Sequence, residues 1–220
     1  MFMTALMMQA ATEQPVVSDA PASAETEVIA QDTGLDRANV LTGINGYLNS
    51  IDTLRARFMQ ISPQGQVIGG LLSIDRPGRL RFEYDDPSPI SVIADGTTVA
   101  MQDRALETVD RAPIRSTPLW WLLKEEIDVE ADAQIVSLIS DQGLTFLIVR
   151  DPNGEMEGQI QFVFEGEDFV LREWYVTDAL GQITRIILED QETGMDLSPR
   201  LFVIPEPEDR RDSRRGRGRG

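Results

Sequence analysis

The sequence predicts a mainly β protein, a barrel or strongly curled antiparallel sheet with a few short helices. Three observations lead to this fold class. Strand-like segments follow one another at short intervals, turn residues separate them, and no internal repeat of fixed period is visible. In residues 79–84, charged and apolar side chains alternate at every position, as a half-buried antiparallel strand requires.

The first expected element is an amphipathic helix over residues 35–51. Its apolar side chains recur at near-helical spacing, so one face of the helix is apolar. These side chains are Leu35, Val40, Leu41, Ile44, Leu48 and Ile51. We expect this helix to cover one face of the sheet.

Strands follow the helix in two groups. Turn chemistry separates neighbouring strands at residues 63–65, 95–96, 151–154 and 178–181. The predicted strands of the first group are 54–61, 66–75, 79–85, 89–94, 97–102 and 106–110. Those of the second group are 134–140, 144–150, 157–165, 168–177 and 182–190, followed by a brief strand near 201–204.

The run 117–125 lies between the two groups and interrupts the strand pattern. Thr117 is a predicted N-cap with Pro118 at the first helical position, which favours a short apolar helix. Adjacent residues on a helix point about 100° apart, so Trp120 and Trp121 cannot both face inward. One indole can fill the interior, while the other packs within the helical segment or meets a membrane interface or a partner.

The chain of 220 residues contains no histidine and no cysteine. This composition excludes Ser-His-Asp and Cys-His catalysis, His-ligated zinc and disulfides. The net charge is −17, and because residues 210–220 hold six arginines and one aspartate, the rest of the chain carries −22. Such an acidic body disfavours nucleic acid as a partner. We expect no cofactor and no metal, since Asp151, Asn153, Glu155 and Glu157 lack the full EF-hand ligand pattern.

The two ends of the chain differ in composition from the part between them. Residues 1–34 are predicted to be a truncated or atypical export signal and a disordered linker. Residues 1–10 are apolar like the centre of an export signal, but the usual basic n-region is missing. An unstructured cytosolic extension is the alternative. Residues 208–220 form an Arg/Gly-rich tail that we expect to be disordered. Residues 35–207 then form one domain.

Short motifs recur in a fixed order along this domain. They are Phe58-x-Gln60, Gly70 with Leu72, Arg76-Pro77-Gly78 before Leu80-Arg81-Phe82-Glu83-Tyr84, Pro87, Ile93-Ala94-Asp95-Gly96-x-x-Val99, Thr117-Pro118-Leu119, Trp174-x-Val176-x-Asp178, Gly181-x-x-Thr184 and Leu201-Phe202-x-Ile204-Pro205. Through their order and spacing, residues 38–207 resemble the LolA family of periplasmic lipoprotein carriers. Each motif alone has little specificity.

The resemblance implies a single, strongly curved, incompletely closed antiparallel β-barrel, covered by a few helices that form a lid over an apolar cavity. It implies a periplasmic chaperone rather than an enzyme. Such a chaperone takes acylated lipoproteins from an inner-membrane ABC transporter to an outer-membrane acceptor or to the outer membrane itself. The chain has no G-x-x-x-x-G-K-[ST] loop, so it does not energise this step itself. We expect a monomer.

The resemblance also gives roles to individual residues. Arg76 matches an arginine that latches the lid through hydrogen bonds to helix backbone, and the five donors of a guanidinium suit that task. A surface ion pair is the alternative role for Arg76. The side chains expected to line the cavity or form the lid, with core packing as the alternative, are Phe58, Leu80, Phe82, Leu119, Trp120, Trp121, Leu122, Leu123, Val40, Ile44 and Leu48.

Two other functions stay open at this point. A related periplasmic lipid- or glycolipid-binding module, or a lipoprotein acceptor, would share the fold. A lipid-anchored acceptor would need a cysteine, which this chain lacks. A β-barrel enzyme that acts through carboxylates or serine is the third possibility, and the missing histidine argues against it.

Overall fold

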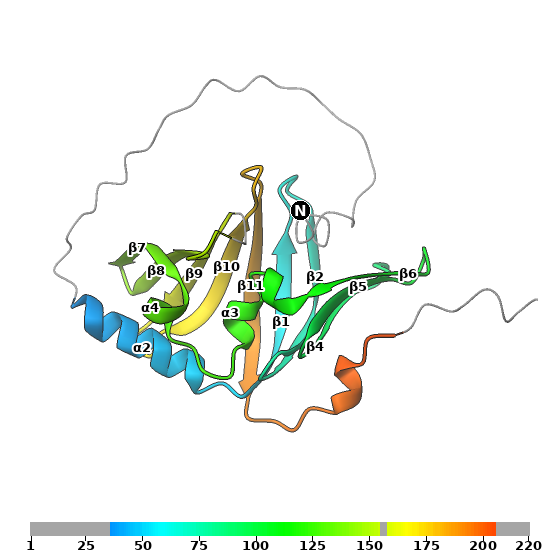
Figure 1. Cartoon of the computed structure of the whole chain (residues 1–220), viewed down its shortest axis with the longest axis horizontal. Coiled ribbons are helices and arrows are strands. Elements are labelled where there is room, and N and C mark those ends of the chain that lie inside the picture. Colours follow the sequence, from blue (N-terminus) through cyan, green and yellow to red (C-terminus); the bar gives the residue numbers. More distant parts are fainter. Residues whose placement is uncertain (1–35, 155–157, 206–220) are drawn as a thin grey trace, which may run out of the picture.

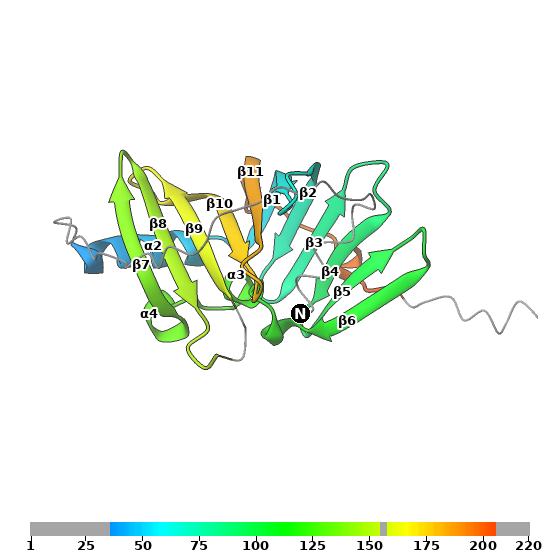
Figure 2. The same cartoon turned by 90° about the horizontal axis from the view of Figure 1, so that it is seen from above.

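The computed structural model describes residues 36–154 and 158–205 (Figure 1). Eleven strands of this part form one sheet in which every neighbouring pair is antiparallel. The strand order is β6-β5-β4-β3-β2-β1-β11-β10-β9-β8-β7, so β6 and β7 lie at opposite ends of the sheet (Figure 2). The sheet curls without closing. The prediction of a mainly β, incompletely closed antiparallel barrel is confirmed.

The elements follow the predicted order. The strands are β1 (Thr53–Ile61), β2 (Val67–Asp75), β3 (Arg79–Tyr84), β4 (Ile90–Asp95), β5 (Thr98–Asp103), β6 (Thr108–Pro113), β7 (Gln134–Asp141), β8 (Leu144–Arg150), β9 (Gln159–Glu165), β10 (Val170–Thr177) and β11 (Ile183–Thr193). The helical elements are α2 (Arg37–Asn49), η1 (Ile114–Ser116), α3 (Trp120–Leu123), α4 (Val129–Asp132) and η2 (Pro199–Phe202).

Alternation along the strands divides the sheet into an inner and an outer face. On β1, Leu54, Ala56 and Phe58 are buried, whereas the residues between them are more exposed. The helices α2, α3 and α4 lie on the inner side of the curled sheet (Figure 1). The main hydrophobic core is therefore enclosed between the inner face of the sheet and these helices.

The C-terminal segment covers part of the outer face. Phe202 on η2 is buried, and the Arg79 guanidinium lies 5.8 Å from the centre of its ring. The Arg81 Nη1 donates to the Leu201 carbonyl at 3.2 Å. Arg79 and Arg81 belong to β3, so η2 packs against the outer face near β3 and β4.

The brief strand predicted near 201–204 is wrong. This segment contains the end of the 3₁₀ helix η2, in which Leu201 N donates to the Ser198 carbonyl at 3.0 Å. Pro199 stands at the start of η2, where its missing N–H costs no helical hydrogen bond. A short apolar run such as Leu201 to Ile204 has the same pattern in a strand and in a buried turn, so periodicity does not separate the two.

Two further details differ from the predictions. β6 begins at Thr108 instead of 106, because the Asp103 carboxylate accepts from the N–H groups of Ala105 and Leu106 and extends the turn. Thr117 is not an N-cap. Its hydroxyl donates to the Ile114 carbonyl at 2.8 Å and so closes η1, and the following helix begins only at Trp120.

Some predictions concern residues outside the described ranges. The export signal and linker at 1–34 and the tail at 208–220 lie there, as do Glu155 and Glu157 of the calcium-like loop. The proposed domain limits therefore stay predictions. In residues 36–154 and 158–205, none of the helices has the length and apolar character needed to cross a bilayer.

Candidate functional site

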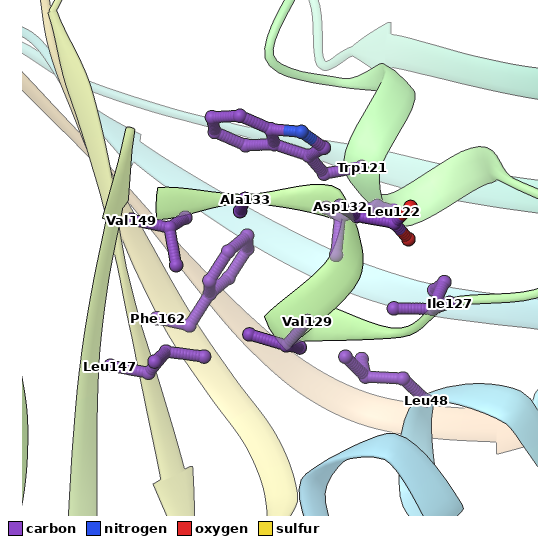
Figure 3. A pocket seen from close by; sticks show the side chains of 10 residues that line it. All are labelled: Leu48, Trp121, Leu122, Ile127, Val129, Asp132, Ala133, Leu147, Val149 and Phe162. Carbon is purple, nitrogen blue, oxygen red and sulfur yellow. The ribbon is translucent and has the colours of Figure 1, made fainter. Parts of the chain in front are cut away.

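A small apolar cavity lies between the inner face of β8 and β9 and the segment that carries α3 and α4. We refer to residues 114–133, which contain η1, α3 and α4, as the lid segment. Side chains from α2, the lid segment and the two strands point toward one another around the cavity (Figure 3). The lining residues are Leu48, Trp121, Leu122, Ile127, Val129, Asp132, Ala133, Leu147, Val149 and Phe162.

The cavity measures about 20 Å³. One water molecule needs roughly 10–15 Å³ on the same measure, so the space holds little more than a single water. The protein's own side chains therefore occupy the volume between the lid segment and the sheet. An extended apolar ligand can enter only if the lid segment moves away from β8 and β9.

Asp132 is the one charged residue that lines the cavity, and it has partners. Its carboxylate pairs with the Lys124 ammonium and accepts from the Asp128 N–H at 3.0 Å. The Asp128 carboxylate in turn accepts from the N–H groups of Glu130 and Ala131, which caps α4. These bonds join the end of α3 to α4, so the lid segment is internally cross-linked.

Arg76 joins the sheet to the helices. It follows β2, and its guanidinium donates to the carbonyls of Leu48, Ile51, Lys124 and Glu125, those of Ile51, Lys124 and Glu125 at 3.0, 2.7 and 3.1 Å. The Leu48 carbonyl belongs to the last turn of α2, the Ile51 carbonyl follows that helix, and the other two follow α3. Carbonyl groups at helix ends are partially negative, so a fork of cationic donors suits them.

Burial lowers the pKa of Arg76, and nearby Asp52 acts in the opposite direction. The ordinary pKa of a guanidinium lies so far above neutrality that the group keeps its charge. Its hydrogen bonds therefore persist over the physiological pH range. The contacts of Arg76 are to backbone carbonyls of two helical segments, rather than to the surface carboxylate considered as the alternative.

Two asparagines on α2 also hold the lid segment, and sequence reasoning missed both. The Asn49 side chain donates to the Ile127 carbonyl and accepts from the Ile127 N–H, both at 2.8 Å. Asn45 Oδ1 accepts from the Val129 N–H at 3.1 Å. Each asparagine directly follows an apolar residue of the helix, where a polar side chain is usually solvated, so the sequence carried no signal for these bonds.

The structure brings together some of the residues expected at the cavity. Leu48, Trp121 and Leu122 line it. The others do not line it but are buried in the hydrophobic core, and these are Val40, Ile44, Phe58, Leu80, Phe82, Leu119 and Leu123. Trp120 is half-buried, and its ring lies 4.8 Å from the Arg115 guanidinium carbon. The two adjacent indoles therefore have different surroundings.

The remaining lining residues were not singled out from the sequence. Leu147, Val149 and Phe162 lie on strands that were predicted, but every strand offers such inward side chains and nothing marked these three. Ile127 and Val129 belong to the part of the lid segment around α4. This helix has only four residues, too few for a periodic pattern.

A separate aromatic cluster packs on the inner face of the sheet over β1 and β3. The Phe58 ring packs edge-on against Phe82 and Tyr84, with centroids 5.0 and 5.2 Å apart. The Tyr84 hydroxyl donates to the Gln60 side-chain carbonyl at 2.8 Å, and burial raises the pKa of Tyr84. The buried tyrosine hydroxyl of this cluster therefore has a hydrogen-bond acceptor within the core.

Comparison with known proteins adds to this geometry. Residues 49–205 match the family described as "Outer membrane lipoprotein carrier protein LolA". The chain belongs to the LolA family. Membership confirms the prediction that it belongs with carriers rather than enzymes.

This LolA-family chain is similar to the following relatives and solved structures. It is 30% identical to the "Outer-membrane lipoprotein carrier protein" of Methylococcus capsulatus, over 74% of this chain and 82% of the relative. It is also 30% identical to the protein of the same name from Nitrosomonas europaea, over 78% and 87%. A DUF1329 family protein from Desulfovibrio piger shares the fold with TM-score 0.50 and 10% identity, over 75% of this chain and 95% of that one. The LolA superfamily protein NE2245 of Nitrosomonas europaea gives TM-score 0.45 at 8% identity, over 74% and 97%.

Proposed function

We propose that this LolA-family chain is a periplasmic chaperone that shelters the acyl chains of lipoproteins and carries them to the outer membrane. The acyl chains occupy the space between the inner face of the sheet and the lid segment. The observation that carries the proposal is an apolar cavity beneath a lid segment that Arg76 holds against the sheet. The names of the relatives support lipoproteins as the cargo.

The energetics of the cargo require such a shelter. Each acyl methylene moved from water to an apolar site contributes about 0.8 kcal/mol. Exposure of an anchor with several chains to water therefore costs tens of kcal/mol. A carrier must also release this anchor. In the empty protein, Leu122 and Val129 of the lid segment lie around the cavity opposite Phe162 of β9, and the acyl chains take their place on loading. Exchange of one set of apolar contacts for another keeps the net affinity moderate.

In this proposal the lid has two positions, and the hydrogen bonds of Arg76 define the closed one. The closed position has the guanidinium on the carbonyls of α2 and of the lid segment, and Gly78 N donates to the Leu123 carbonyl at 2.7 Å. In the loaded protein the lid segment lies farther from β8 and β9, and bonds of the latch are broken. Arg76 is thus the proposed latch, and the loss of its bonds offsets part of the affinity for cargo.

The donor in this proposal is an inner-membrane ABC transporter, and the recipient is an outer-membrane acceptor or the membrane itself. The transporter supplies the energy, because the chain contains no phosphate-binding loop of the Walker type. The carrier only has to bind the anchor less tightly than the recipient does.

Mass spectrometry of protein purified from the periplasm of its native host tests the proposal. The expected result is a co-purified protein that carries acyl chains, together with loss of that cargo when the acyl chains are removed. Co-purified free lipid or glycolipid would instead identify a lipid-binding module. Protein that never carries an acylated partner, even when it is mixed with detergent-solubilised lipoprotein, would refute the carrier function.

A further inference from the structure

The strand β7 forms one end of the sheet and pairs only with β8 among the strands that the structure describes. Its other edge is at the rim of the curled sheet (Figure 2). None of its residues is fully buried, and Ile139 on the outer face is 46% exposed. An edge of this kind presents backbone N–H and carbonyl groups to whatever approaches it.

The two end strands differ in how they are protected. Edge strands usually carry charges or proline, which discourage pairing with another chain. β6 contains Asp110, Arg111 and Pro113. β7 has no charged residue, proline or glycine from Gln134 to Ser140. The β7 edge is therefore the one that is suited to accept another strand.

The register identifies the backbone groups that point outward. Gln142 and Gly143 connect β7 to β8 with φ angles of 49° and 80°, which are the values of a two-residue hairpin turn of type I′. Asp141 and Leu144 flank this turn and form its first hydrogen-bonded pair. Pairs alternate from there, so the N–H and carbonyl groups of Leu138 and Ser140 point away from β8.

The edge is continuous with the cavity. Asp132 and Ala133 line the cavity, and β7 begins at the next residue. Leu147, which also lines the cavity, is the direct partner of Leu138 on β7. A ligand whose acyl chains lie in this cavity therefore has its polar part within reach of the free edge.

We propose that the β7 edge binds the polypeptide that follows the acylated residue of the cargo, as an added strand. This inference rests on the proposed carrier function and names the part of the cargo that is recognised. Hydrogen bonds to the main chain do not depend on cargo sequence, so one edge serves lipoproteins with unrelated sequences. The segment after the acylated residue must be extended to form these bonds.

A cysteine scan tests the added strand directly, since the chain itself has no cysteine. The variant Ile139→Cys is mixed with synthetic S-diacylglyceryl lipopeptides that carry one further cysteine at successive positions, and disulfide formation is measured. Ile139 belongs to a pair bonded to β8, so a residue of an added strand that faces it lies in a close, non-hydrogen-bonded pair. The expected yield alternates with a period of two along the peptide. The matched control is Asp110→Cys on β6, which should give low yields without alternation.

A second experiment measures the contribution of the edge to affinity. The variant Ser140→Pro removes an outward N–H, whereas the control Ser140→Ala removes only the hydroxyl that bonds to Thr145 Oγ1 at 2.7 Å. We expect Ser140→Pro to bind the lipopeptide roughly tenfold more weakly and to bind diacylglycerol without peptide unchanged. Ser140→Ala keeps the outward N–H and should therefore bind the lipopeptide more tightly than Ser140→Pro does.

The outcomes separate this inference from the carrier function. Lipopeptide that binds but gives no alternating cross-links, or equal cross-links to β6, would overturn the added strand and leave the carrier function standing. A disulfide-linked pair of Ile139→Cys chains, formed in preference to the lipopeptide adduct, would show that a second copy occupies the edge and would also overturn it. Failure of both lipopeptide and diacylglycerol to bind the native chain would refute the carrier function and the inference together.

Discussion

Replacement of Arg76 by leucine is expected to release the lid segment while the sheet stays folded. The native guanidinium donates to the carbonyls of Leu48, Ile51, Lys124 and Glu125. Hydrogen bonds to charged groups contribute about 1.5–3 kcal/mol each. Because this side chain is half-exposed and its bonds form and break as one unit, we expect a combined loss of about 2–4 kcal/mol for the closed lid.

A loss of this size changes the balance between closed and open lid. Each 1.4 kcal/mol corresponds to a tenfold change, so the ratio of open to closed protein rises roughly 30- to 1,000-fold. Acyl chains bind the open form in the proposed function, and their apparent affinity rises by up to the same factor. Arg76→Leu should therefore load acylated protein readily and release it slowly.

Hydrogen exchange and release kinetics check this expectation. In empty Arg76→Leu protein, the amides of residues 114–133 and of the last turn of α2 should exchange faster, while those of the central strands do not change. Arg57→Leu is the matched control, because it removes an arginine whose ion pair with Asp85 is exposed and screened by solvent. Unchanged exchange in the lid segment of Arg76→Leu, or equal changes in both variants, would show that Arg76 is not a latch.

Three further predictions concern the attachment of the lid segment to α2, the packing of the strand residues that line the cavity, and the stability of the fold in acid. Asn49→Ala removes both bonds to the Ile127 backbone and should destabilise the closed lid by about 1–3 kcal/mol. Faster amide exchange at residues 126–130 would detect this change. Leu147→Ala enlarges the cavity from a fully buried position and should lower the free energy of unfolding in urea by about 2–5 kcal/mol, and a smaller loss than 1 kcal/mol would contradict the packing described. Partial burial acts to raise the pKa of Asp95, but hydrogen bonds from Thr98 and Thr97 outweigh it and the pKa is lowered. The stabilisation from the Asp95 carboxylate is therefore complete above the ordinary carboxyl pKa and is lost as the pH falls through the lowered pKa of Asp95. Asp95→Asn should accordingly show a smaller fall in Tm on acidification than the native chain.

Most of the sheet could be predicted from the sequence because local chemistry determines it. The alternation in β3 matches the burial along that strand, and glycine in left-handed backbone at Gly65 and Gly96 ends strands where the turns were expected. The errors arise where individual side-chain contacts determine the backbone conformation. Asp103 extends a turn by binding backbone N–H groups, and Phe202 packs against Arg79 of β3 rather than pairing in a strand.

The candidate site could be predicted less completely, since a cavity depends on which side chains from distant segments meet. The role of Arg76 was predicted from a family resemblance. In the structure its guanidinium donates to four carbonyls from two segments of the chain. Its bonds to α2 and those of Asn49 to the lid segment meet at the C-terminal end of α2. That end is therefore the point at which sheet, helix and lid are joined. The cavity is lined by Leu48 at this end and by Leu147, whose strand partner is Leu138 of β7, so the proposed acyl site connects this joint with the proposed peptide edge.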